Sequence, residues 1–101
     1  MLEAFLTFGD LKAIPIFCKA RIVERNGLKE GWIDCQIVGN WAEHVSTLGT
    51  VMKNGTVEIH VEDKAGEVLA NLPGFIKNWR NDFLCITIAG EPRILSPSLM
   101  Q

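Results

Sequence analysis

Apolar and polar residues alternate with a period of two along much of this chain, a pattern typical of half-buried β-strands. The clearest case is residues 56–62, where aliphatic side chains alternate with two glutamates and a histidine. Residues 14–24 and 32–38 alternate in the same way, and Asn26-Gly27 between them is a strong hairpin signal. These segments predict strands with one face in a core.

Two further strands are predicted at the ends of the chain, over residues 2–8 and 82–89. In each strand that alternates clearly, we assign the more apolar face to the core. The side chains assigned to the core are Ile16, Cys18, Ala20, Ile22, Ile33, Cys35, Ile37, Val57, Ile59, Val61, Leu84, Ile86 and Ile88.

A short helix is predicted between the third and fourth strands. Asn40 can cap its first turn, with Glu43 three residues later as the capping partner. Gly49 is expected to end it. Apolar residues at spacings of four and three form its predicted core face. These residues are Trp41, Val45 and Leu48.

The segment between the last two predicted strands is the least regular part of the chain. Residues 68–70 fit either a short strand or a helical turn, and residues 75–80 fit a loop or a helical turn. Pro73-Gly74 between them is expected to break regular structure. The last residues of the chain are expected to fray.

The order of the elements indicates a mainly β fold. One short helix cannot cover both faces of a sheet, and a small chain of strands tends to close on itself and so remove its edges. Five strands with one helix between strands 3 and 4 is the order of the OB-fold, so we predict a five-stranded OB-type barrel. A smaller SH3-like barrel and a strand sandwich are the alternatives.

The composition agrees with a single OB-like domain over residues 1–101, because 48% of the residues are apolar and 22% are charged. The formal net charge of −2 lowers the expectation of strong non-specific binding to a polyanion, although basic side chains can still gather on one face. No apolar stretch approaches the roughly 20 residues of a membrane-spanning helix, so no membrane association is expected.

The three cysteines, Cys18, Cys35 and Cys85, lie in apolar runs and lack the C-x-x-C spacing of a zinc or dithiol site. This pattern indicates reduced thiols that pack in the core as small hydrophobic side chains. Reduced core thiols are typical of the cytoplasm, so a cytoplasmic location is expected.

Three short motifs lie in the middle of the chain: Trp32-Ile33-Asp34-Cys35 in the predicted third strand, Ala42-Glu43 in the predicted helix, and Lys53 with Gly55 in the turn that follows. In these motifs, residues 16–62 resemble the bacterial single-stranded DNA-binding protein family, in its third strand, short helix and following turn. Glu62-Asp63 departs from the family, which has a glycine-rich entry to the fourth-strand hairpin. The resemblance implies an OB-fold, binding of single-stranded nucleic acid, and assembly into a homo-oligomer through a strand edge.

Single-stranded nucleic acid is bound by aromatic rings that stack on bases, beside cations that follow the phosphates. The outer face of the second and third strands and a basic–aromatic cluster near residue 79 provide both kinds of group. The predicted nucleic-acid-binding residues are Phe17, Lys19, Arg21, Arg25, Trp32, Lys77, Trp79 and Arg80. The alternative is that Phe17 and Trp32 pack under a loop or in a subunit interface, with the lysines as solvated surface.

The acidic outer face of the fourth strand argues against a polyanion ligand. Glu58, His60 and Glu62 lie on it, and acids near a phosphate path weaken binding. They suggest a non-enzymatic protein-interaction or oligomerisation barrel without nucleic-acid binding as the alternative function, and a weak metal chelate as a remote one. A small-ligand barrel is a third possibility. No catalytic, metal or cofactor motif is present, so no enzyme activity and no cofactor are expected.

Overall fold

Six β-strands form a closed barrel in the computed structural model, which describes residues 1–94 and 96–101. The strands are β1 (Leu2–Phe8), β2 (Ile14–Arg25), β3 (Leu28–Ile37), β4 (Val57–Asp63), β5 (Val68–Arg80) and β6 (Phe83–Ile88). Between β3 and β4 lie the 3₁₀ helix η1 (Trp41–His44) and the α-helix α1 (Val45–Asn54), and the chain ends in the 3₁₀ helix η2 (Pro97–Met100).

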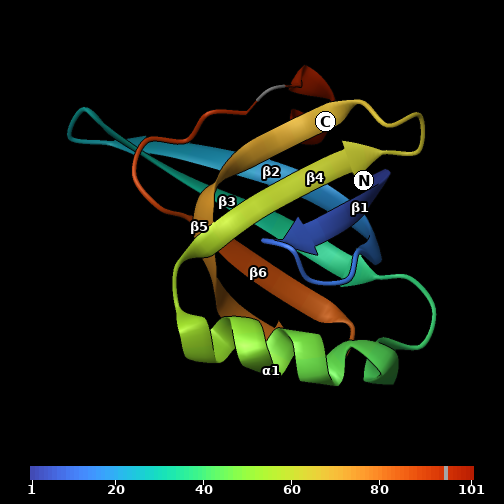
Figure 1. Ribbon diagram of the computed structural model, residues 1–101. Helices are drawn as coiled ribbons and strands as arrows, with labels where there is room; N and C mark the ends of the chain where they lie inside the picture. Colours follow the sequence, from blue (N-terminus) through green and yellow to red (C-terminus); the bar gives the residue numbers. More distant parts are fainter. Residues whose placement is uncertain (95) are drawn as a thin grey trace.

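The strands follow one another around the barrel in the order β1-β2-β3-β6-β5-β4, and β4 pairs with β1 to close it (Figure 1). Every neighbouring pair is antiparallel. The predicted barrel and the helix between the third and fourth strands are confirmed. The predicted number of five strands is wrong, because the irregular segment between the last two predicted strands is itself a long strand, β5.

Pro73-Gly74 does not interrupt β5 but marks the point where this strand changes partner. Residues before this point pair with β4 and residues after it pair with β6, while Gly74 lies opposite both Val57 and Ile88. A Cβ atom on Gly74 would lie 2.6 Å from the carbonyl oxygen of Thr87. Only glycine therefore allows the backbones of β5 and β6 to come this close. This explains why Pro73-Gly74, a pair typical of turns, occurs inside a strand.

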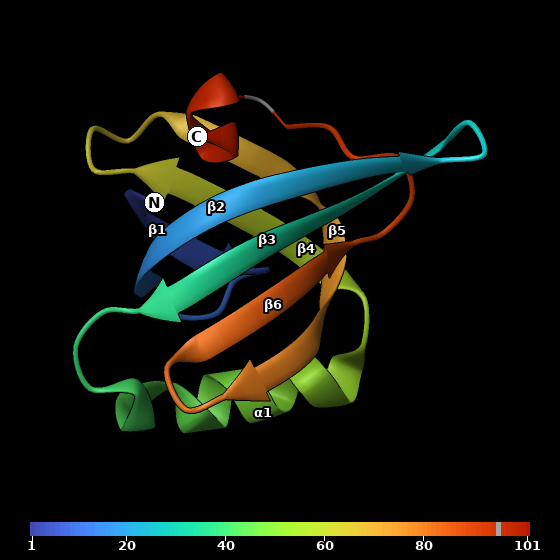
Figure 2. The same cartoon turned by 180° about the vertical axis from the view of Figure 1, so that it is seen from behind.

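The predicted core faces of the strands are confirmed with one exception. Twelve of the thirteen assigned side chains are buried or packed against the core, and Ile22 is 37% exposed. Ile22 is exposed because the hairpin of β2 and β3 extends beyond the barrel (Figure 2). The predicted turn at its tip is confirmed: Asn26 and Gly27 have φ of 53° and 78°, the two positive values of a type I′ turn.

Helix α1 covers one end of the barrel, where Leu48 and Val51 are fully buried. The predicted cap is confirmed in part, because Asn40 Oδ1 accepts a hydrogen bond of 3.2 Å from the Ala42 backbone N–H. The predicted stop at Gly49 is wrong, since the helix continues to Asn54 and places Val51 in the core. Val45, assigned to the core face, is 42% exposed.

The C-terminal segment covers the other end of the barrel instead of fraying (Figure 1). Ser96 N–H donates to the Leu69 carbonyl oxygen at 3.2 Å, and Leu99 of η2 is fully buried. Within the part of the chain that the structure describes, no helix has the length and hydropathy needed to cross a membrane.

Candidate nucleic-acid interface

The outward side chains of β2, β3, β6 and β5 form three cross-strand rows. This surface is turned toward the viewer in Figure 2, where β2, β3 and β6 run side by side. The rows are Phe17, Gln36, Phe83, Arg80; then Lys19, Asp34, Cys85, Asn78; then Arg21, Trp32, Thr87, Phe75. We call this surface the aromatic face, because it holds a half-buried tryptophan and three phenylalanines, each of which is at least 36% exposed.

Two cations flank the Trp32 ring in the third row of the aromatic face. The Arg21 guanidinium carbon lies 5.1 Å from the ring centroid and the Lys77 Nζ lies 5.9 Å from it, both within the range of a cation–π interaction. Arg21 reaches the ring from β2, on one side of β3, and Lys77 reaches it from β5, beyond β6. Trp32 therefore presents an aromatic surface and positive charge at the same place.

Asp34 holds Arg21 in this position. Its two carboxylate oxygens accept from Arg21 Nε at 2.5 Å and from Nη2 at 3.2 Å, a bidentate pair. The hydrogen bond to Asp34 raises the pKa of Arg21 further above its usual value, so the guanidinium stays charged. This acid of the second row is therefore neutralised by its neighbour.

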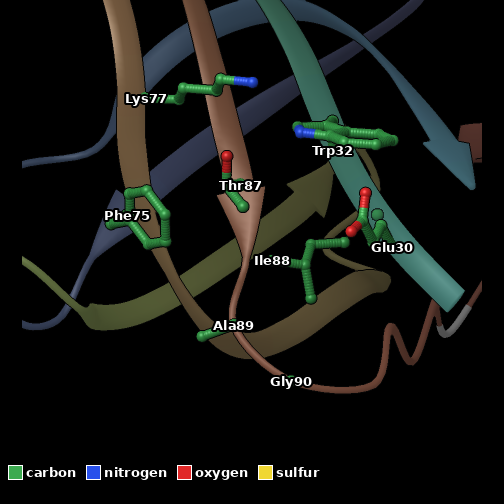
Figure 3. Close-up of a pocket in the computed structure, with 9 residues that line it drawn as sticks. Glu30, Trp32, Phe75, Lys77, Thr87, Ile88, Ala89 and Gly90 are labelled. Atoms are coloured by element: carbon green, nitrogen blue, oxygen red, sulfur yellow. The ribbon is translucent and has the colours of Figure 1, made fainter. Parts of the chain in front are cut away.

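Two hollows lie side by side on the aromatic face, and both are lined by Trp32 and Lys77. The first, which we call the Phe75 hollow, has a volume of about 450 Å³ and includes Glu30 and Thr87 (Figure 3). The second, the Arg25 hollow, has a volume of about 470 Å³. Its side chains include three cations, and these are Arg21, Arg25 and Lys77. Both volumes are in the range of ligand-binding clefts.

The structure brings seven of the eight predicted binding residues onto the outer side of this sheet. Lys77 lies at a β-bulge between Ile76 and Asn78, which lets its side chain join the outer face. Trp79 is the exception. It lies opposite Leu84 on the inner side of β5, packs against the core, and donates from Nε1 to the Asn81 carbonyl oxygen at 2.8 Å.

Among the residues that line the two hollows, Glu30, Phe75, Phe83 and Thr87 were not among the binding residues predicted from the sequence. Phe75 was missed because its segment was not recognised as a strand. Phe83 and Thr87 alternate with the core residues of β6, so the period-two pattern placed them outside, but nothing in it indicated which strands would lie beside them. Glu30 lies on the same side of β3 as Trp32 and belongs to the polar end of the hairpin.

The acidic outer face of β4 lies on the opposite side of the barrel from Trp32. Two strands lie between β4 and β3 whichever way one goes around the barrel. His60 Nε2 is 2.8 Å from Glu62 Oε1, which pairs two members of the acidic row with each other. Across residues 1–94 and 96–101, no three His, Cys, Asp or Glu side chains gather in a group that could hold a metal ion.

All three cysteines are free thiols, and their surroundings keep them protonated near neutral pH. Burial raises the pKa of Cys18 to about 11 and raises the pKa of Cys35 well above its usual value. Cys85 lies on the aromatic face, where desolvation and then the nearby Asp34 carboxylate raise its pKa as well. A protonated thiol is a poor nucleophile, so these cysteines do not suggest covalent catalysis.

Comparison of the chain with models of protein families, with curated proteins and with solved structures finds no match. The resemblance of residues 16–62 to the bacterial single-stranded DNA-binding proteins stays a prediction. Any function therefore has to be inferred from the barrel and from the chemistry of the aromatic face.

Proposed function

We propose that this protein binds single-stranded nucleic acid on its aromatic face. The observation that carries the proposal is the Trp32 ring, which two cations flank between two adjoining hollows. An unpaired strand offers planar bases and a phosphate backbone at regular spacing. Trp32 and the exposed phenylalanines can stack on bases, and Arg25 and Lys77, which form no ion pair within the described residues, can neutralise phosphates in the neighbouring hollow.

The energetics favour this use of the face. A base stacked on an aromatic side chain contributes about 1–3 kcal/mol, and phosphate contacts release counterions from the strand. Three acids that could oppose a phosphate do not lie free at this surface, because Asp34 is paired with Arg21, and Glu58 and Glu62 lie across the barrel. Glu30, which lines the Phe75 hollow, is the acid that remains beside it. The net charge of −2 is therefore compatible with a locally basic surface.

The relation to the OB-fold is part of the proposal. OB-fold proteins bind oligonucleotides mainly on the face of their second and third strands, and the aromatic face includes β2 and β3 of this barrel. The helix between β3 and β4 also agrees with that fold, whereas the sixth strand departs from it. We infer a divergent barrel that keeps the same binding surface and widens it with β6 and β5.

The proposal is tested by fluorescence anisotropy of a labelled fifteen-nucleotide thymidine strand at two salt concentrations. Trp32→Ala is expected to weaken binding about tenfold, the loss of one stacked base. Phe5→Ala is the matched control, because Phe5 is a 41% exposed aromatic residue on β1, outside the aromatic face. Equal affinity of the wild type and Trp32→Ala, or no binding of DNA or RNA strands at low salt, would refute the proposal.

A second candidate function is protein interaction or self-association without nucleic acid. It is favoured by Leu28, which is 72% exposed at the tip of the hairpin that projects beyond the barrel (Figure 2). An apolar side chain in such a position can anchor a protein partner. Light scattering distinguishes the two candidates: a wild-type oligomer that becomes monomeric in Leu28→Ser, with no affinity for oligonucleotides, supports the second.

A further inference from the structure

The Phe75 hollow contains a hydroxyl group that lacks a hydrogen-bond partner. Thr87 Oγ1 is buried, and no atom of the described residues bonds to it. Buried polar groups in proteins are nearly always paired, so an unpaired one beside a cavity needs an explanation. Figure 3 shows the Thr87 oxygen pointing toward the space between Lys77 and Trp32. A ligand that enters there, once the long Lys77 side chain moves aside, can supply the missing partner.

The same hollow contains a carboxylate that is not engaged elsewhere. Glu30 lines it, and forms no ion pair within the part of the chain described here. Asp34, two residues further on the same side of β3, has both oxygens occupied by Arg21. A free carboxylate within a phosphate-binding surface weakens binding unless the ligand donates hydrogen bonds to it.

We propose that the Phe75 hollow binds one guanine base of the nucleic-acid strand. This inference rests on the proposed function and adds base preference to it. Trp32 and Phe75 provide apolar walls for a planar ring system, Glu30 accepts from the ring N1–H and the exocyclic amine, and Lys77 donates to the O6 carbonyl. The Thr87 hydroxyl gains a partner on the same base.

The arrangement of charges selects guanine among the bases. Guanine has two adjacent N–H donors beside a carbonyl oxygen on its pairing edge, and these are complementary to a carboxylate and an ammonium group that line the same hollow. Thymine and uracil have one N–H between two carbonyls. Cytosine and adenine offer only their amine to the carboxylate, and their ring nitrogen on that edge is an acceptor, which the carboxylate would repel.

The backbone around the hollow is arranged to admit a base. Gly31 and Gly90 both line it, and Gly90 adopts a φ of +77° that favours glycine. A Cβ on Gly31 would lie 2.7 Å from Pro92 Cβ, so glycine lets the segment after β6 pack closely against β3. This contact holds one rim of the hollow in place before any ligand binds. The entropic cost of ordering the rim on binding is therefore lower.

The test compares thymidine 15-mers with a single central guanine, inosine, cytosine or adenine. We expect the guanine strand to bind about tenfold more tightly than all-thymidine, and inosine, which lacks the exocyclic amine, to lose most of that gain. Thr87→Val, which keeps the side-chain shape, and Glu30→Gln are each expected to reduce the guanine preference to about twofold. Glu24→Gln, on the same hairpin but outside both hollows, is the matched control.

The outcomes separate the two proposals. Equal binding of all five strands overturns the guanine inference and leaves the proposed function standing, whereas no binding of any strand overturns both. A preference for cytosine or adenine, or a guanine preference that survives both Glu30→Gln and Thr87→Val, also overturns the inference. Because inosine changes the ligand and not the protein, that comparison decides the question even if a variant fails to fold.

Discussion

Arg21 and Trp32 lie directly opposite each other on β2 and β3, with the guanidinium carbon 5.1 Å from the centroid of the indole ring. The pair belongs to the third row of the aromatic face, between the two hollows. Asp34 fixes the guanidinium from the next row through two hydrogen bonds. The aromatic ring therefore contacts an arginine, and that arginine is bonded to an acid.

This relationship predicts a measurable coupling between the two side chains. A double-mutant cycle with Arg21→Ala and Trp32→Leu, followed by urea unfolding, should give an interaction free energy of about 0.5–1 kcal/mol. The same cycle with Lys19→Ala in place of Arg21→Ala serves as the control, since Lys19 lies opposite Asp34 and not opposite Trp32. Additive effects of Arg21→Ala and Trp32→Leu would contradict the prediction.

The proposed phosphate contacts predict a specific dependence on salt. With Arg25 and Lys77 each meeting a phosphate, the logarithm of the association constant should fall with the logarithm of salt concentration with a slope of about −1.4. Lys77→Ala should make that slope shallower by about 0.7 and weaken binding at low salt. Lys53→Ala, at the end of α1, should leave the slope unchanged. A salt-independent affinity would exclude phosphate contacts as a main source of binding.

Gly74 and Gly49 are expected to respond to alanine in opposite ways. Gly74→Ala forces a Cβ to within 2.6 Å of the Thr87 carbonyl oxygen, so it should lower the free energy of unfolding by about 2–3 kcal/mol. Gly49→Ala adds a methyl group in open space on a helix, so it should raise the free energy of unfolding by about 0.5–1 kcal/mol. Urea denaturation measures both, and a neutral Gly74→Ala would contradict the close approach of β5 and β6.

The buried thiols predict a loss of stability at alkaline pH. Cys18 has a pKa of about 11 in the folded barrel against an ordinary value of 9.0, so between these values the unfolded chain loses the proton first. The unfolded chain then binds fewer protons, and the free energy of unfolding should fall by about 1.4 kcal/mol per pH unit for each such thiol. The stabilisation is fully present below pH 9 and lost as pH rises toward 11.

Urea denaturation with reducing agent at pH 8, 9.5 and 10.5 measures this loss. Cys18→Ala should show a shallower decline than the wild type, because one of the titrating thiols is gone. Cys35 contributes with the same sign, since burial also raises its pKa, so a residual decline is expected in Cys18→Ala. Identical slopes in the two proteins would show that other groups cause the alkaline loss.

Features that depend on one element, or on two that adjoin in sequence, were predictable from the sequence. The alternation of apolar and polar residues within a strand indicates which side of the strand is apolar. That side faces the core wherever the strand is placed in the sheet. The Asn26-Gly27 turn and the Asn40 cap depend only on their own neighbourhood, and the structure confirms both. The outer positions of Arg21 and Trp32 follow from the same alternation.

Pairings between distant segments were decided only by the tertiary structure. Pro73-Gly74 is typical of a turn, yet closure of the barrel requires one strand to pass from β4 to β6 at that point. Likewise, Gly49 is a plausible helix end, but burial of Val51 over the barrel outweighs the low helix propensity of one glycine.

The candidate site shows the same division. The sequence by itself determined that cationic side chains of β2 lie close to Trp32 and that the outer side of β4 is acidic. Only the closed order of strands decided that Phe75 and Thr87 lie beside Trp32 and that the β4 acids lie opposite it. The physical reason is that local sequence specifies which face of a strand is buried, whereas the neighbours of that strand are chosen by the packing of the whole barrel.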